Sequence, residues 1–559
     1  MKALESRKSV SLTLVIISLI SITVAISPFP GFDVYNEIKL FLLTMLAFPL
    51  MYHVVKLNLN KHFFHLNRTS IFLIFCLLLS LLIPIIFSSS LLSQQFWGVL
   101  GRNNGLLTFF GLATIFLYFS SVQDISVPLI VSNAVILVSI FIQFFSILEI
   151  SGLLFGIEKS VTVLGPLTTF GNPNFTSAFL GFSTCIVFFR LLDKKLLFFY
   201  RCFLALIIAT NIIIFFLSGS VQGLISSTLG IFFVLIVHRK WTKLLVKKSL
   251  IFMVFFITLI FSVIRISGIN PFEILKNDNS LIYRFDYWQA GLSMFLNNPL
   301  TGVGLNSYGD WYRQSRSLSA ATRGDVNRFS DSAHNTFIDL AANAGILAVF
   351  FILLITVFIF YRIFSRLTKS KISVPNSLLG ISAAWIAWFI QNLISMEQIG
   401  VAIWGWTFAG ILMNSGSYQD QKNLTNFSKE KIRLRPSQSK SLLFIVLLSI
   451  AGGFLGSVPL RSDWKVYNAI QKNSSIEILK SLDSVGVTAF HFRYASYVAI
   501  NRIQDNQLII SINDRHLSKF PRDFSGLVIK YYRADLTSSE KAKILSTLKQ
   551  NDPFNSSIK

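Results

Sequence analysis

The chain has 559 residues, of which 53% are hydrophobic and only 14% are charged. Soluble domains carry about one quarter charged residues, so this composition excludes an ordinary soluble protein and indicates a membrane protein. The net charge of +24 could indicate nucleic-acid binding, but the bases gather in short segments between apolar stretches. That distribution is typical of membrane topology.

Apolar windows of about 20 residues recur along the chain, each long enough to cross a hydrocarbon core about 30 Å thick. They lack the alternation of barrel strands, and backbone groups in lipid must be satisfied within each segment, so we predict helices. About 12–13 spans are expected: residues 10–27, 38–55, 69–87, 105–121, 126–148, 174–192, 196–217, 220–237, 249–266, 336–360, 376–394, 399–414 and 441–459. The SPFPG that follows the first window is a poor cleavage site, so we expect that window to be a retained anchor.

The distribution of Lys and Arg predicts the orientation of these spans. With Lys2, Arg7 and Lys8 in the cytoplasm, the inside segments carry 25 Lys and Arg, whereas the short outside loops carry only Arg102 and Lys159. An excess of bases marks the cytoplasmic side. The positive charge therefore reflects topology, with attraction to anionic lipid as a minor alternative, and the C-terminus is predicted to lie outside.

We predict an all-α fold: a polytopic transmembrane helical bundle followed by a small extracytoplasmic α-helical domain. The membrane body is residues 1–459, and its largest insertion, residues 267–335, is called the long loop below. Residues 460–559, called the tail, show apolar residues three and four apart, which is typical of short amphipathic helices. The tail could form two or three helical hairpins, similar to tetratricopeptide repeats, although it lacks a clear period of about 34 residues. The same pattern is equally compatible with a helical cap that has no function of its own.

Charged residues within the predicted spans lie only near their edges, as Lys39 does. Ion-coupled transporters usually bury ionisable groups near the membrane midplane, so the pattern disfavours a transporter. The three cysteines lie in or beside spans and indicate neither a disulfide framework nor a metal cluster. The long loop has equal numbers of acids and bases, so an anion site in it would need individual arginines in fixed geometry.

Two residues of the long loop are candidates for chemistry. His334 is the only histidine that we place on the outer face of the membrane body, and its unperturbed pKa of about 6.5 would let a neutral ring accept a proton. The alternative to a catalytic His334 is that this motif only begins a helix, with the side chain of Asn335 or Ser332 capping the first backbone amides. Arg284 precedes an apolar helix-like run. The alternative for Arg284 is that it has no ligand and only extends its guanidinium from the membrane interface to water.

Five segments together resemble the O-antigen ligase and polymerase superfamily, over roughly residues 95–415. They are GRNNGLLTFF, TTFGNPNFTSAFL (168–180), RFDYWQAGLSMFLNNPLTGVGLNSY (284–308), AHNTFIDLAANAGILA (333–348) and QNLISMEQIGVAIWGWTFAG (391–410). The arginine block with its Pro–Gly–Val–Gly turn, followed by His–Asn and a helix, is the specific part of this resemblance, whereas GNPN alone is weak.

The resemblance implies a bacterial inner-membrane glycosyltransferase, with an undecaprenyl-type polyprenyl-diphosphate glycan as donor. The acceptor would be a sugar, a lipid-linked glycan or a protein hydroxyl on the outer face, for polysaccharide biosynthesis in the cell envelope. His334 matches the family's essential histidine and Arg284 its diphosphate-associated arginine. Neither a metal nor another cofactor is implied. The supporting residues would be Asn335, Asp286, Gln222 and Asn174.

One departure from the family pattern is evident. Many relatives carry an arginine in a Ser-Arg-Gly turn in mid-chain, where this chain has LSGSVQGLIS (217–226), with Gln222 nearby and no arginine. We expect Arg102 to take over this function, because its predicted outer loop is otherwise nearly uncharged. Arg102 and Arg284 would then hold the diphosphate.

Other functions stay open at this point. A helical tail outside the membrane could recruit a protein, which favours a polymerase or a protein O-oligosaccharyltransferase over a lipid A ligase. A lipid-linked oligosaccharide flippase would move the glycan without forming a bond, and it would be expected to show internal repeats or buried charge. A structural scaffold explains the topology but not the three basic residues expected on one face.

Overall fold

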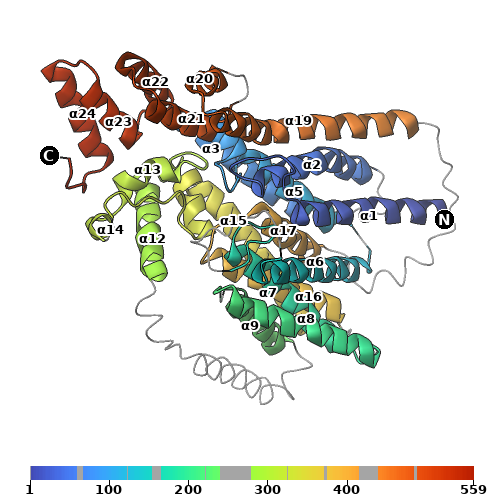
Figure 1. Cartoon of the computed structure of the whole chain (residues 1–559). Helices are drawn as coiled ribbons and strands as arrows, with labels where there is room; N and C mark the ends of the chain where they lie inside the picture. Colours follow the sequence, from blue (N-terminus) through green and yellow to red (C-terminus); the bar gives the residue numbers. More distant parts are fainter. Residues whose placement is uncertain are drawn as a thin grey trace.

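The computed structural model describes residues 2–59, 67–122, 124–153, 165–220, 222–238, 279–323, 325–369, 374–414, 438–483 and 487–558. These residues form α-helices and no strand, as the composition predicted. The helices of the membrane body run side by side, with the N-terminal end of α1 and the C-terminus at opposite ends of the bundle (Figure 1).

Among the residues that the structure describes, seven helices are long and apolar enough to cross a membrane. Their full bounds are α2 Asn36–Leu59, α3 Arg68–Phe87, α6 Val127–Ile150, α7 Pro173–Leu191, α8 Phe198–Leu217, α15 Thr336–Lys369 and α19 Gln438–Gln471. Five further predicted spans are helices that end sooner or contain fewer apolar residues: α1 Lys2–Val24, α5 Leu106–Ser121, α9 Gln222–Val237, α16 Asn376–Asn392 and α17 Ile399–Met413. The predicted span 249–266 lies outside the described residues. The orientation of the bundle in the membrane stays a prediction.

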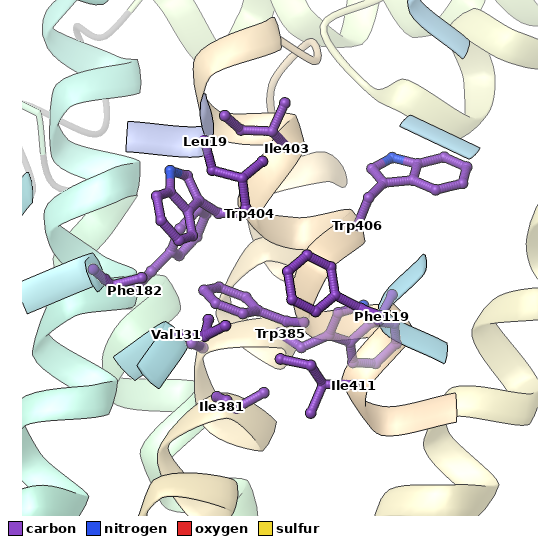
Figure 2. Close-up of a cluster of buried hydrophobic side chains, with 14 of the residues drawn as sticks. Leu19, Phe119, Val131, Phe182, Ile381, Trp385, Ile403, Trp404, Trp406 and Ile411 are labelled. Carbon is purple, nitrogen blue, oxygen red and sulfur yellow. The ribbon is translucent and has the colours of Figure 1, made fainter. Parts of the chain in front are cut away.

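The centre of the bundle is α17, whose fifteen residues are all buried. A helix that is apolar on every side is stable only when protein surrounds it, and α17 packs against α5, α16, α1 and α15. Figure 2 shows the aromatic side chains that fill this core, with Trp404 and Trp406 from α17 facing Phe182, Phe119 and Trp385 from its neighbours. This rigid core fixes the helix ends at which the polar residues lie.

The long loop begins, in its described part, with α12 Asn279–Asn297, and its NNPLTGVG turn is inserted into α15. The α15 backbone breaks at Gly345, which has φ 76° and ψ −172°, a conformation almost confined to glycine. The carbonyls freed by the break accept hydrogen bonds from the N–H groups of Val303 (2.8 Å) and Gly304 (3.1 Å), and Ile346 N–H donates to the Pro299 carbonyl (2.8 Å). The turn therefore satisfies the backbone groups that the break exposes.

The rest of the long loop forms α13 Tyr308–Ser315 and α14 Leu318–Thr322, and the tail lies over it (Figure 1). After α19 the tail contains α20 Ser475–Asp483, α21 Ala489–Arg502, α22 Asn506–Lys519, α23 Phe524–Arg533 and α24 Ser538–Asn551. Each of these helices contacts the next one in sequence, as in a series of hairpins. The predicted boundary at 459/460 falls inside α19, so the last membrane helix continues into the tail without interruption.

Buried ion pairs hold α13 to the tail. Arg316 and Asp552 are both fully buried and pair at 2.7 Å, and Arg313 reaches the same carboxylate at 3.0 Å. Arg493 of α21 pairs with Asp310 of α13 at 2.5 Å. We call these five residues the clamp. Part of the tail surface is therefore occupied by the long loop of the same chain.

Candidate functional site

His334 lies in the short connection between the long loop and α15, held by local backbone geometry. Its φ is 51°, a left-handed conformation that is uncommon outside glycine, although asparagine, aspartate and histidine adopt it more often than other residues. Its N–H donates to the Ser332 hydroxyl at 3.2 Å. The Asn335 carboxamide oxygen accepts from the first α15 amides, Phe337 (3.0 Å) and Ile338 (3.1 Å). Asn335 is thus a helix cap, which was the alternative interpretation of this motif.

The ring of His334 stacks on Tyr287 of α12, with centroids 5.4 Å apart and planes at 28°. Tyr287 is itself fixed, because the Tyr308 hydroxyl donates to its carbonyl at 2.5 Å. Asn343 supports the start of α13, since its side-chain oxygen accepts from Ser307 N–H and Tyr308 N–H, both at 3.0 Å. The imidazole is therefore positioned by the long loop and α15 together.

The two predicted arginines lie near this ring. Arg102 forms an ion pair with Asp331, three residues before His334. Burial first, and then the positive charges of Arg102 and Arg284, lower the pKa of His334 from 6.5 to about 4, against the opposing effect of Asp331. The imidazole is therefore neutral at physiological pH and can accept a proton. Segments more than 200 residues apart thus meet around one ring.

A cavity opens beside this group, with a polar end and an apolar body. Asp331 and Thr336, which flank His334 in sequence, both line it; among the described residues, His334 and Arg284 are not part of the lining themselves. The polar end is lined by Arg102, Asn104, Asn306, Asp331, Asp339, Asn343 and Glu397, and the body by Phe109, Phe116, Leu340, Ile352, Ile355, Ile359, Trp385, Trp388 and Trp406. Several of the body residues belong to the core in Figure 2. The cavity therefore passes from charged groups into the membrane body.

Glu397 is a lining residue that sequence reasoning did not single out. It lies between α16 and α17, where it accepts a hydrogen bond from the Trp406 indole at 3.2 Å. Burial raises the pKa of its carboxyl group to about 7. The backbone carbonyl of Glu397 accepts from the Asn104 amide at 2.6 Å, which ties this connection to the Arg102 loop. A carboxyl group that titrates near neutrality can also exchange protons.

The other supporting residues have different surroundings. Asp286 pairs with Arg323 at 2.8 Å on the long loop. Gln222 accepts a hydrogen bond from Gln391 (2.7 Å), next to the lining residue Asn392, and Asn174 accepts one from the Ser220 hydroxyl (2.8 Å). Each of these three side chains therefore has a partner of its own: Arg323 for Asp286, Gln391 for Gln222 and Ser220 for Asn174.

Asp331, Asp339 and Asn343 also line the cavity without having been predicted. A signal for the last two was present: Asp339 and Asn343 are four residues apart in AHNTFIDLAANAG, which places them on one helix face. Asn343 donates to Asp339 at 3.1 Å, and the other Asp339 oxygen accepts from Ala333 N–H at 2.9 Å. The pairing of Asp331 with Arg102, 229 residues away, left no local signal.

Comparison with protein families matches residues 203–353 to the family described as O-antigen ligase. The match contains Arg284, His334 and the turn that enters α15, and it ends eight residues after Gly345. Comparison with curated proteins finds no match.

Proposed function

We propose a specific function for this membrane protein, from the match of residues 203–353 to the O-antigen ligase family and from its long apolar helices. The protein transfers a glycan from a polyprenyl-diphosphate-linked donor to an acceptor hydroxyl at the outer face of the bacterial inner membrane. His334 is the base, and Arg284 and Arg102 bind the diphosphate.

The observation that carries this proposal is the two-part cavity next to His334. Arg102, three amide side chains and three carboxylate side chains line one end, with Asp331 already paired with Arg102, and aromatic and branched aliphatic side chains line the body. An isoprenoid diphosphate has the same two parts, an anionic head and an apolar chain. Guanidinium groups bind diphosphate oxygens with two parallel hydrogen bonds, while an isoprenoid chain gains free energy when it enters an apolar passage.

In the reaction, the acceptor oxygen attacks the anomeric carbon while the bond from that carbon to the diphosphate oxygen breaks. His334 takes the hydroxyl proton, and the polyprenyl diphosphate leaves with the bonding electron pair. Such a single displacement inverts the anomeric configuration. Fixed guanidinium groups stabilise the leaving charge, an effect worth about 100- to 1,000-fold in rate, and a positioned base adds about 100- to 10,000-fold. The arginines supply this charge stabilisation, so the step needs no metal.

Donor binding would also change the basicity of His334. Burial is the main cause of the low pKa of the ring, and Arg102 and Arg284 lower the pKa further; a bound diphosphate would offset the positive charge of the two arginines. The ring would then become a stronger base only when the donor is bound. Proton uptake by the ring would therefore be coupled to transfer and would not occur without the donor. The low pKa without donor therefore fits a base whose partner is a bound anion.

A second reaction of the same class would use a protein hydroxyl as the acceptor. The feature that favours it is the helical tail, which packs against α13 of the long loop. The tail would carry or select a protein acceptor, whereas a ligase or polymerase would use a sugar hydroxyl. Acceptor choice by the full-length protein distinguishes these reactions, since transfer to peptide acceptors but not to sugar or lipid-linked acceptors would favour a protein hydroxyl.

The experiment combines purified full-length protein with a polyprenyl-diphosphate glycan and a panel of sugar, lipid-linked and peptide acceptors, followed by mass spectrometry. We expect a product with a new glycosidic bond and one released polyprenyl diphosphate per bond formed. Movement of the donor across proteoliposomes with no new bond under any acceptor would instead establish the flippase. The H516Q variant, altered at a buried tail histidine, is the control for general damage.

A further inference from the structure

A second cluster of ligand-type side chains lies where the tail meets the membrane body. Glu37 at the start of α2, Asp463 in α19 and His491 in α21 each direct one ligand atom into a space where these atoms lie within 4.8 Å of one another. All three side chains are buried, at no more than 2% exposure. Their sequence positions are far apart, so spacing gave no sign of them.

Within the described residues, the Glu37 carboxylate lacks a compensating hydrogen bond. Neither of its carboxylate oxygens accepts one from the part of the chain that the structure describes. Lys39, on the same helix, donates instead to the backbone carbonyls of Ala25, Tyr35 and Thr169. If both carboxyl groups are ionised beside at most one imidazolium, the cluster has excess negative charge, which is strongly unfavourable when buried and which either a proton or a bound cation would compensate.

The distances fit a bound cation. His491 Nε2 lies 3.2 Å from Asp463 Oδ1 and 3.5 Å from Glu37 Oε1. Two ligands of a tetrahedral Zn²⁺ ion, each about 2.0–2.2 Å from the metal, lie about 3.3–3.6 Å apart. The second Glu37 oxygen or a water molecule would complete the coordination. The imidazole favours a transition-metal ion over Ca²⁺ or Mg²⁺, which prefer oxygen ligands alone.

The groups around these ligands are arranged as metal sites require. The other ring nitrogen of His491, Nδ1, lies 2.7 Å from the Thr488 hydroxyl, which can accept its proton and leave Nε2 free to bind. Asp463 is held by the backbone N–H groups of Phe32 (3.0 Å) and Asp33 (3.1 Å). Hydrogen-bond partners of this kind fix the orientation of the side chains that bind the metal and increase the affinity for the metal.

From this geometry we infer that Glu37, Asp463 and His491 bind a divalent transition-metal ion, such as Zn²⁺, that fastens the tail to the membrane body. The ion is structural and separate from the transfer chemistry, and the inference does not depend on the proposed function. It would also support the Arg102 loop. Asp33, whose N–H binds Asp463, accepts a hydrogen bond from Gly101 N–H at 3.0 Å through its own carboxylate.

The test measures metal in full-length protein purified in detergent with a tag that contains no histidine. After incubation with Zn²⁺ or Mn²⁺ and removal of free ions, elemental analysis should find about one ion per chain. E37Q and H491Q should lose it, whereas H516Q, at a buried histidine in the same tail, should keep it. Wild-type protein without metal, or E37Q and H491Q with as much metal as wild type, would overturn the inference.

A second measurement covers the case in which the variants fail to fold. Wild-type protein is treated with a chelator and its melting temperature is measured before and after Zn²⁺ is added back. We expect the melting temperature to fall on chelation and to recover with Zn²⁺, because an ion that binds only the folded state stabilises it. No shift in either direction would mean that the cluster is a proton-sharing ion pair and not a metal site.

Discussion

Arginines of the long loop occupy two contrasting surroundings. In the clamp, Arg316 is fully buried and its guanidinium pairs with an equally buried carboxylate. Near His334, Arg284 is half-buried and lies close enough to the ring to lower its pKa. Both regions contain aromatic neighbours and both come from the same loop.

This difference distinguishes arginines that stabilise the fold from arginines that serve the functional site. A buried arginine with a carboxylate partner has its charge satisfied within the protein, and removing either partner leaves a costly buried charge. Arg102 is also paired with a carboxylate, that of Asp331, but both side chains line the cavity, so a ligand can reach this guanidinium. Substitutions in the clamp should therefore reduce stability first, and substitutions at the cavity end should reduce activity first.

The largest expected effect on stability is at the clamp. D552N leaves Arg316 buried without a carboxylate, a change that costs about 3–5 kcal/mol. The loss should be seen as faster hydrogen exchange in α13 and α24. The matched control is D514N, because Asp514 pairs with Lys530 at the surface and such pairs contribute about 0–1 kcal/mol. Unchanged exchange in D552N would contradict the assignment of the clamp as scaffold.

The largest effect on activity after His334 is expected at Arg284. R284K keeps the charge but loses the planar fork, so transfer should fall by about 100- to 1,000-fold while the melting temperature stays near that of wild type. R323K on the same loop, where Arg323 is partly exposed and pairs with Asp286, should keep transfer within a few-fold. Full activity in R284K would mean that Arg284 only extends to the interface.

A smaller effect is expected where the turn enters α15. G345A forces a side chain into a left-handed backbone position where its Cβ would lie 2.5 Å from the Leu300 carbonyl oxygen. The cost should be about 1–3 kcal/mol, measured as a lower melting temperature with reduced transfer. G219A is the control, because Gly219 also has positive φ but open space around it. Equal losses in both variants would show that backbone strain alone, and not the packed turn, is responsible.

The smallest effect is expected in the pH dependence. Protonated His334 cannot accept a proton, so kcat/KM should fall only as the pH drops toward about 4, the pKa of the ring without donor. The acidic limb of kcat should lie at higher pH, because bound diphosphate raises that pKa. E397Q is the control, since Glu397 has a pKa of about 7 in the same cavity. Two outcomes would contradict the assignment of the acidic limb to His334. One is a kcat limb at lower pH than the kcat/KM limb, and the other is a kcat limb that disappears in E397Q.

Much of the fold could be predicted from hydropathy, because each span must satisfy its own backbone in lipid. The helical tail followed equally from apolar spacing. The meeting of His334 with Arg102 and Arg284 was expected from family resemblance and topology, not from local pattern.

What could not be predicted depends on contacts distant in sequence. The AANAGILA stretch has the pattern of an unbroken helix, and only the inserted turn explains the break at Gly345. Asp286 was expected to support the ring or the acceptor, and its ion pair with Arg323 had no signal in the sequence. The pairing of Arg102 with Asp331 and the cluster of Glu37, Asp463 and His491 join segments that no spacing rule connects.

The most direct test of the central claim is transfer by H334N. Asparagine tolerates the left-handed backbone at this position but is not a base, so the fold should be kept. Donor binding and product formation are measured on the same preparation. We predict donor affinity within about twofold of wild type and transfer reduced by about 100- to 10,000-fold. Transfer near the wild-type rate would contradict the assignment of His334 as the base.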